Sequence, residues 1–283
     1  MRSLGIMQGR LTPSRGRGIQ FFPFDNWKRE FEIGSKIGIN EIEWIFDYDR
    51  YVDNPLWDAT GIQLINRVEE ETGVEVKSVC FDYFMRRPFF KAAKVEAAAI
   101  RKENIEFVKK IITGMKEIGA YILEIPFVDA SSMKTTDEKN YVTEFLSEVL
   151  IIADDVDVLI GCETDMPVGT FRNFLDSVNH PRIRANYDSG NSSGLGYKHS
   201  DELLSLSEYV ANVHIKDRVY QGTTVTLGSG SADFDQVFSS LKKIKYGGSI
   251  VLQAARGEDG NEVTNIKNQL SFVKTYCKEY GLE

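Results

Sequence analysis

Short apolar runs alternate along the chain with longer amphipathic stretches. Eight of the runs are rich in Ile, Val and Leu and do not alternate cleanly between apolar and polar positions. That pattern is typical of parallel strands covered on both faces. It predicts strands at 4–8, 41–46, 76–81, 121–126, 158–163, 183–188, 210–215 and 249–254.

Each predicted strand is followed by a stretch with apolar residues at helical spacing. Asn26 stands where it can cap the first helix, and Gly73 and Gly119 follow two others as C-terminal stops. The predicted helices are 26–37, 62–71, 96–118, 141–153, 171–178, 201–209, 234–244 and 265–280.

Eight strands alternating with eight helices predict a parallel sheet with right-handed crossovers. A chain of 283 residues has the size of one closed (β/α)8 TIM barrel, so residues 1–283 are predicted to form a single domain. The alternative is a doubly wound open sheet. Its first strand would usually end in a Gly-x-Gly-x-x-Gly turn, whereas this chain has Gln8-Gly9-Arg10 there.

Composition and charge limit the partners and the cellular compartment that the sequence predicts. The formal net charge of −8 gives no general attraction to nucleic acid or anionic lipid. Cys80, Cys162 and Cys277 are too widely spaced for a disulfide framework. The apolar run near the N-terminus is too short to predict a signal peptide, and no stretch approaches the roughly 20 apolar residues of a membrane span. These features predict a cytoplasmic protein without nucleic-acid or membrane partners, and they leave homo-oligomers open.

Candidate chemistry gathers where the predicted strands end. Barrel enzymes carry their active sites at the C-terminal ends of the strands. Glu163, Asp188, His214 and Gln253 lie at or near these ends on four consecutive strands. Each of these residues by itself has a purely structural explanation as a solvated, turn-forming or core residue. Together they form a mixed oxygen and nitrogen set suited to one Mn²⁺, Mg²⁺, Co²⁺ or Zn²⁺ ion.

Other polar residues near the strand ends are candidates for substrate binding. Basic side chains there can grip hydroxyls, a carboxylate or a phosphate, although surface salt bridging explains each equally well. Inward-facing glutamates can orient a substrate or supply an acid, or they can pair with ions inside the barrel. The candidates are Arg10, Glu43, Glu124, Asn191, Lys216, Arg218 and Arg256.

Two further features allow a functional and a structural explanation. Trp44, Phe81, Tyr83 and Phe84 near the mouths of the second and third strands could form an apolar wall for a sugar, or simply core. The backbone amides of Gly-Ser-Gly-Ser at 228–231 could cradle a phosphate, although such a segment is usually just a turn.

Three segments carry a resemblance to a known family. Glu163-Thr164-Asp165, Tyr187-Asp188-Ser189-Gly190-Asn191 and His214-Ile215-Lys216-Asp217 resemble the xylose-isomerase-like barrel superfamily. This superfamily includes tagatose and ribulose-phosphate 3-epimerases, hexulose-6-phosphate isomerase relatives, inosose dehydratase and AP endonucleases. The similarity spans essentially the whole chain, from Gly5-Ile6-Met7-Gln8-Gly9-Arg10-Leu11 to the last helix.

The resemblance implies a metal-dependent isomerase or epimerase acting on a small sugar or sugar phosphate. In the epimerases, four matching positions bind the metal, and the two outer ones also exchange protons with the substrate. By that match Glu163, Asp188, His214 and Gln253 are metal ligands, and Glu163 and Gln253 occupy the catalytic positions.

Gln253 departs from the family pattern, which has a glutamate there. An amide oxygen can ligate a metal, but an amide accepts no proton at neutral pH. A one-base route remains, in which Glu163 moves a proton through a metal-stabilised enediolate. Two alternatives stay open: an inosose-dehydratase-like lyase, and a non-catalytic barrel that binds a sugar or a metal.

The AP-endonuclease branch is disfavoured by the histidines. Its metal cluster requires several histidines at strand ends, and this chain has three in total. His180 precedes a predicted strand and His199 precedes a helix, so only His214 is in place.

Overall fold

A computed structural model describes residues 4–91 and 97–283. Its main sheet is a closed barrel of parallel strands in which each strand pairs with the next along the chain and the last pairs with the first. The strands are β1 (Leu4–Met7), β2 (Glu41–Ile45), β3 (Glu75–Cys80), β4 (Ile122–Phe127), β5 (Leu159–Thr164), β6 (Ile183–Asp188), β7 (Val210–Ile215) and β10 (Ile250–Leu252). The predicted TIM barrel is confirmed, and the open sheet is excluded.

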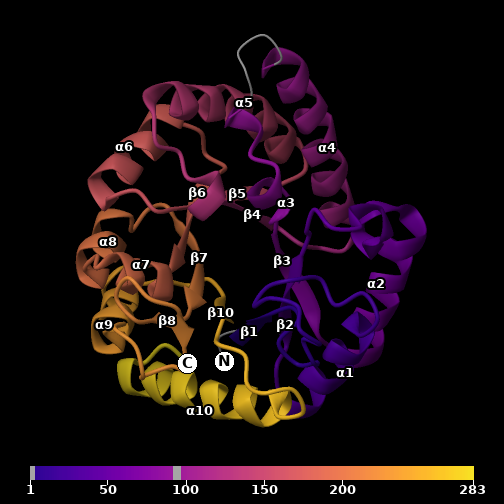
Figure 1. Ribbon diagram of the computed structural model, residues 1–283, viewed down its shortest axis with the longest axis vertical. Helices are drawn as coiled ribbons and strands as arrows, with labels where there is room; N and C mark the ends of the chain where they lie inside the picture. The colour runs from indigo at the N-terminus through magenta and orange to yellow at the C-terminus, as the bar shows by residue number, and fades with distance from the viewer. Residues whose placement is uncertain (1–3, 92–96) are drawn as a thin grey trace.

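Helices surround the strands, as Figure 1 shows along the colour gradient from indigo to yellow. The long ones are α1 (Trp27–Ile37), α2 (Ala59–Thr72), α4 (Ala97–Glu117), α5 (Thr136–Asp155), α6 (Val168–Val178), α9 (Phe234–Lys243) and α10 (Glu262–Tyr280). Residue 96, where one helix was predicted to begin, lies outside the described residues.

Capping explains where several helices begin and end. α5 begins at Thr136, earlier than the predicted 141, because the Thr135 side chain and Glu138 form a capping box. Gly73 ends α2 in the left-handed conformation, as predicted. Asn26 does occupy the N-cap position of α1, but its side chain makes no capping hydrogen bond.

The largest differences from the predicted elements lie beside the barrel mouth. α3 (Tyr83–Arg86), α7 (Ser189–Leu195) and the antiparallel pair β8 (Asp217–Arg218) and β9 (Thr224–Val225) were not predicted. The helix predicted over 201–209 is instead α8 (His199–Ser205). These pieces are too short to show a clear periodicity, and they are fixed by contacts with distant residues.

The apolar core lies mainly between the barrel and the helices, whereas polar side chains fill part of the interior. Trp44, Phe81 and Phe84 are buried in the core. Glu43 and His214 are also fully buried. Among the described residues, no helix has the length and apolar character needed to cross a membrane.

Candidate active site at the C-terminal mouth of the barrel

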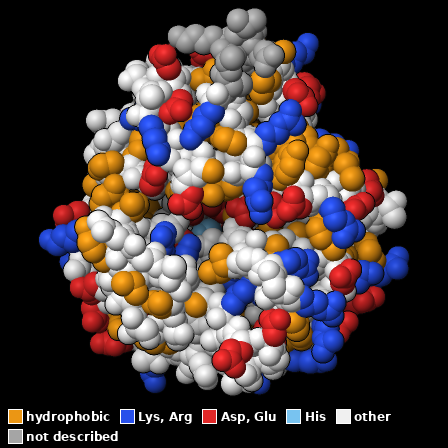
Figure 2. All heavy atoms as spheres, in the orientation of Figure 1, with side chains coloured by type: hydrophobic (Ala, Val, Ile, Leu, Met, Phe, Trp, Pro, Cys, Tyr) orange, Lys and Arg blue, Asp and Glu red, His pale blue; other side chains and the backbone are white. Residues whose placement is uncertain are grey.

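A cavity of about 520 Å³ opens at the C-terminal ends of the strands. Figure 2 shows a hollow near the centre of the face toward the viewer, with basic and acidic side chains gathered around it. The lining residues are Ile19, Gln20, Asp47, Asp82, Met85, Arg86, Glu124, Pro126, Val128, Asp129, Glu163, Asn191, Lys216, Arg218, Gly222, Thr223, Thr224 and Gln253.

Three of the predicted ligands converge beside this cavity, and one of them, Glu163, lines it. The Nδ1 atom of His214 lies 3.6 Å from Glu163 Oε2 and 4.0 Å from Asp188 Oδ2. The side chains come from the neighbouring strands β5, β6 and β7, and all are buried. The strand-end argument therefore placed these residues together correctly.

Glu43 reaches His214 from the far side of the barrel interior. Its Oε1 atom lies 2.7 Å from His214 Nε2, and its Oε2 accepts hydrogen bonds from Ser78 Oγ and Asn212 Nδ2, both at 2.6 Å. Burial acts to raise the pKa of Glu43, but the contact with His214 outweighs it and lowers the pKa. This contact directs Nε2 toward Glu43 and leaves Nδ1 facing Glu163 and Asp188.

The charge around His214 is negative. Burial by itself lowers the pKa of this imidazole, but Glu43, followed by Glu124 and Glu163, raises it to about 10. A positive charge is therefore favourable at this position, either as a proton or as a metal ion that displaces the proton.

Two asparagine amides hold Glu163. Asn186 Nδ2 donates to Oε2 at 2.7 Å, and Asn191 Nδ2 donates to Oε1. Burial, reinforced by the charge of Asp188, raises the pKa of Glu163. The carboxylate is thus fixed in orientation at the cavity wall and has a greater proton affinity than an exposed glutamate.

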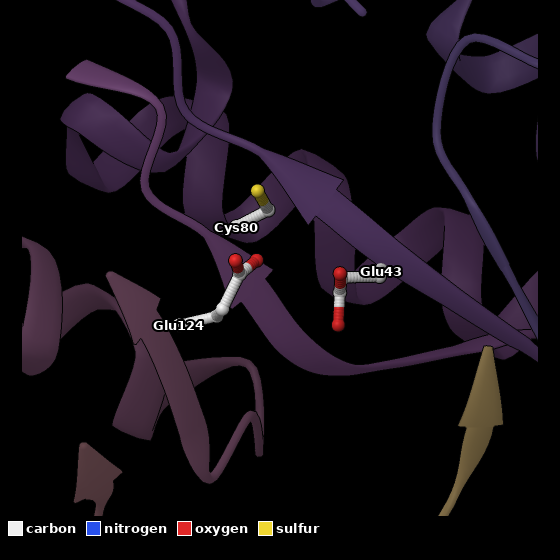
Figure 3. Close-up of side chains that lie close together, drawn as sticks. All are labelled: Glu43, Cys80 and Glu124. Atoms are coloured by element: carbon white, nitrogen blue, oxygen red, sulfur yellow. The ribbon is translucent and has the colours of Figure 1, made fainter. Parts of the chain in front are cut away.

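Glu124 and Cys80 lie next to this group on β4 and β3. In Figure 3 the Glu124 carboxylate points toward the Cys80 sulfur, with Glu43 on the neighbouring strand. Burial raises the pKa of Glu124 well above its usual range. Its Oε2 atom is buried without a hydrogen-bond partner among the described residues.

These donors fit a divalent cation. Potential ligand atoms of Glu124, Glu163 and His214 all lie within 4.8 Å of one another, and Asp188 is adjacent. Buried carboxylates in excess of cations are costly unless a cation neutralises them. Imidazole with carboxylates suits Zn²⁺, Mn²⁺ and related ions.

Gln253, the fourth predicted ligand, is engaged with neighbouring side chains. Its Oε1 accepts a hydrogen bond from Lys216 Nζ at 2.9 Å, and its Nε2 donates to Gln20 Oε1 at 3.2 Å. Lys216 Nζ also lies 3.3 Å from Asp188 Oδ2. An ammonium group therefore connects two of the four predicted ligands.

The predicted substrate-binding residues divide into two groups. Glu124, Asn191, Lys216 and Arg218 line the cavity, so their side chains are placed where a ligand could reach them. Glu43 lies behind His214.

Arg10 and Arg256 are not among the residues that line the cavity. Arg10 is buried and donates to the carbonyl oxygens of Ala254 and Ile19. Arg256 donates to the carbonyl oxygens of Ile19 and Thr12 and stacks over Phe21. The hydrogen bonds from these two guanidinium groups to backbone carbonyls connect the loops after β1 and β10.

The backbone amides of the glycine-rich segment at 228–231 bind a carboxylate of the same chain. The Asp217 carboxylate accepts hydrogen bonds from the backbone amides of Gly228, Gly230 and Ala232 at 2.8–3.0 Å. These amides are therefore engaged by a side chain of the same chain, so the turn explanation holds.

The aromatic residues near β2 and β3 belong to the core. None of Trp44, Phe81, Tyr83 and Phe84 is among the residues lining the cavity. Its apolar surface comes instead from Ile19, Met85, Pro126 and Val128.

Several residues of the site were missed from the sequence. Asn186 lies two residues before Asp188, which ends β6 and was the residue singled out there. Gln20, Asp47 and Asp82 come from loops whose paths the sequence pattern does not indicate, and Arg86 comes from the short helix α3. An inward-facing asparagine in a buried strand is the one signal that reasoning from the sequence could have used.

The family pattern described as the xylose isomerase-like TIM barrel matches residues 31–276. The chain belongs to this family, as the resemblance of its strand-end segments predicted.

Curated relatives are sugar epimerases. The L-ribulose-5-phosphate 3-epimerase UlaE of Salmonella heidelberg (strain SL476) is 23% identical over 266 residues, covering 90% of this chain and 92% of that protein. The protein of the same name from Escherichia coli (strain SMS-3-5 / SECEC) is 24% identical over 267 residues, with the same coverage. These relatives confirm the prediction of an isomerase-class enzyme.

Solved structures agree on the fold. An L-ribulose 3-epimerase superposes with a TM-score of 0.75 at 16% identity, covering 99% of this chain and 96% of that one. A D-psicose 3-epimerase gives a TM-score of 0.76 at 11% identity, with coverage of 97% and 99%.

Proposed function

We propose that this protein is a divalent-metal-dependent isomerase or epimerase of a small ketose, free or phosphorylated. Glu163, Asp188 and His214 would hold the ion, with Gln253 as a neutral neighbour. When bound, such an ion supplies Lewis-acid polarisation of the substrate carbonyl.

The observation that carries this proposal is the setting of Glu163. Its carboxylate lies at the cavity wall, is fixed by Asn186 and Asn191, and has a raised pKa beside Asp188 and His214. A positioned carboxylate of that kind serves as a general base for a proton next to a carbonyl. It would remove the proton from one carbon and return it to the neighbouring carbon.

Gln253 favours the one-base version of this chemistry. Glu163 and Gln253 both line the cavity, and β6 and β7 lie between their strands in the barrel. In the family pattern the second proton-exchanging group stands at position 253. Since an amide takes no proton there, aldose–ketose isomerisation at one face of the substrate is the simplest reaction for this pair.

The relatives favour a second candidate, epimerisation at carbon 3, which needs proton exchange on both faces. The two reactions are distinguished by NMR in deuterated water, with Mn²⁺ added and ketoses or their phosphates as substrates. One-face isomerisation yields an aldose and places deuterium on one face of one carbon. Epimerisation inverts a stereocentre and exchanges the proton at that centre.

Other outcomes would overturn the proposal. Loss of water from an inosose without isomerisation of ketoses would indicate the dehydratase alternative. Binding of sugar without turnover of any substrate, at several metals and pH values, would indicate a non-catalytic barrel.

A further inference from the structure

Arg218 has an unusual setting for a guanidinium. It lies on β8 at the cavity wall and is partly buried. Its Nη1 donates to Asn191 Oδ1 at 3.1 Å, and its Nη2 and Nε donate to Gly222 O at 2.9 and 3.3 Å. All of these acceptors are neutral.

No carboxylate pairs with Arg218 among the ion pairs of the described residues. Lys216, the neighbouring cation of the cavity wall, differs in this respect because it pairs with Asp188 at 3.3 Å. A partly buried guanidinium held by neutral groups keeps its full charge and has donors to spare for an anion.

Two glycines of α7, one turn apart, make room for the basic side chains. A Cβ atom at Gly190 would lie 2.5 Å from Lys216 Cγ, and one at Gly194 would lie 3.1 Å from Arg218 Nε. The stems of both cations therefore pack directly on the backbone of α7. Such close packing fixes the position of each charge relative to Glu163.

Asn191 connects the two cations to the proposed base. Its Oδ1 accepts from both Lys216 Nζ, at 3.2 Å, and Arg218 Nη1, while its Nδ2 donates to Glu163. The cationic pair and the carboxylate are thus held by one side chain. A ligand held by Arg218 would meet Glu163 across a short distance.

The segment after β8 completes the wall. Asp217 holds the backbone at 228–232, and β9 pairs with β8, so Thr223 and Thr224 line the cavity next to Arg218. Hydroxyl groups beside a guanidinium are common partners of phosphate oxygens.

We propose that Arg218, with Lys216 and the hydroxyls of Thr223 and Thr224, binds the phosphate of a phosphorylated ketose. This inference rests on the proposed function and specifies its substrate class. A guanidinium fork offers two parallel hydrogen bonds to a phosphate, and Lys216 adds a second positive charge. The opposite wall, with Asp47 and Asp82, would face the neutral hydroxyls.

Binding of inorganic phosphate to the purified protein, followed by calorimetry, tests the subsite without turnover. Arg218→Met should weaken phosphate affinity about 10–100-fold, as expected for loss of a charged hydrogen-bonding partner. Gly194→Ala keeps every charge but displaces the guanidinium, so it should give a smaller loss. Lys242→Met, a surface change on α9, is the matched control and should have no effect.

Acetate titrated in parallel separates phosphate from a simple carboxylate preference. Tighter binding of acetate than of phosphate would overturn the proposal in favour of an acidic sugar. Equal phosphate affinity in wild type, Arg218→Met and Gly194→Ala, or no phosphate binding by wild type, would also overturn it. Melting temperatures of all variants show whether any loss comes from unfolding.

Kinetics separate failure of the subsite from failure of the proposed function. Arg218→Met should raise KM for a pentulose phosphate at least tenfold more than KM for the corresponding unphosphorylated ketose, because only the phosphate loses its charged partner. If the wild type binds phosphate through Arg218 yet turns over no ketose, the proposed function fails and the subsite stands. If the variant loses both substrates equally, the subsite assignment fails while the isomerase stands.

Discussion

His214 and His199 are both buried, but the groups that surround them differ in charge. His214 contacts Glu43 through Nε2 and faces Glu163 and Asp188 through Nδ1. His199, the first residue of α8, has Nδ1 2.6 Å from the Tyr187 hydroxyl and 3.2 Å from Ser192 Oγ. One imidazole lies among carboxylates and the other among hydroxyls.

The comparison shows that burial by itself does not decide what a histidine does. Burial lowers the pKa of His199 to about 4. It also acts to lower the pKa of His214, but the surrounding carboxylates raise that pKa to about 10. A histidine among carboxylates indicates a place for a cation, whereas one among hydroxyls is a neutral structural residue.

The largest expected effect is on turnover. Glu163→Gln keeps the size of the side chain and an oxygen that can coordinate a metal ion beside His214, but it removes the group that accepts the proton. Activity should therefore fall by ~10²–10⁴-fold. Initial rates and melting temperature measure this, with the exposed Glu208→Gln as control. If Glu163→Gln stays active, Glu163 is not the base, and Glu124 is the next residue to replace.

Metal content should distinguish the two histidines directly. His214→Ala should reduce bound divalent ion from about one equivalent per chain to a small fraction, because a ligand is lost. His199→Ala should leave metal content unchanged. Elemental analysis after gentle purification decides this, and metal loss in His199→Ala but not in His214→Ala would reverse the assignment.

The pH dependence of the free energy of unfolding should show the opposed titration of His199 and its neighbour Glu202. As the pH falls below 6.5, His199 takes up a proton in the unfolded state. In the folded state it stays neutral until the pH reaches its lowered pKa of about 4. This lowers the free energy of unfolding by up to ~3 kcal/mol. Glu202, linked through Ser192, acts in the opposite direction because burial raises its folded pKa from 4.5 to about 7.

The two contributions should nearly cancel in the wild type between about pH 7 and 4.5. His199→Gln should therefore become more stable relative to wild type as the pH falls, and Glu202→Gln less stable. Urea unfolding at several pH values measures both differences. Parallel curves for the two variants would show that the pair does not titrate as described.

Replacing Glu43 tests whether metal binding at His214 depends on the carboxylate that contacts the other nitrogen of its imidazole. Glu43→Gln should weaken metal affinity about 10–100-fold, because the imidazole loses the carboxylate that orients it. Glu41→Gln is a matched control on the same strand, since Glu41 is buried and bonds Ser249 instead. Equal effects of the two changes would attribute the loss to the barrel interior in general.

The smallest effect is expected from Gln253→Glu. The carboxylate introduced there adds negative charge beside the metal group, but Lys216 already bonds to this side chain and would offset much of that charge. Metal affinity should rise by less than about tenfold. Affinity for inorganic phosphate should fall, and NMR in deuterated water should show whether any epimer appears. A gain well above tenfold would mean that Lys216 does not neutralise the new group.

The sequence determined the barrel and the convergence of three side chains at its mouth. Each of the eight barrel strands was found within two residues of its predicted bounds, because buried parallel strands are short apolar runs between clear turns. Glu163, Asp188 and His214 followed from one geometric rule, since parallel strands bring their C-terminal ends to the same face.

Only the tertiary structure decided which side chains meet across the barrel and within the loops. Barrel closure brings Glu43 to His214, and no local pattern records that contact. The paths of the loops place Arg10 and Arg256 beside backbone carbonyl groups, to which they donate hydrogen bonds. They also place the backbone amides at 228–232 where they donate to the Asp217 carboxylate. Gly190 and Gly194 leave room for Lys216 and Arg218 to pack on α7, a role that the sequence pattern did not indicate. Strand positions follow from local burial, whereas these contacts depend on how distant segments pack, which one sequence does not specify residue by residue.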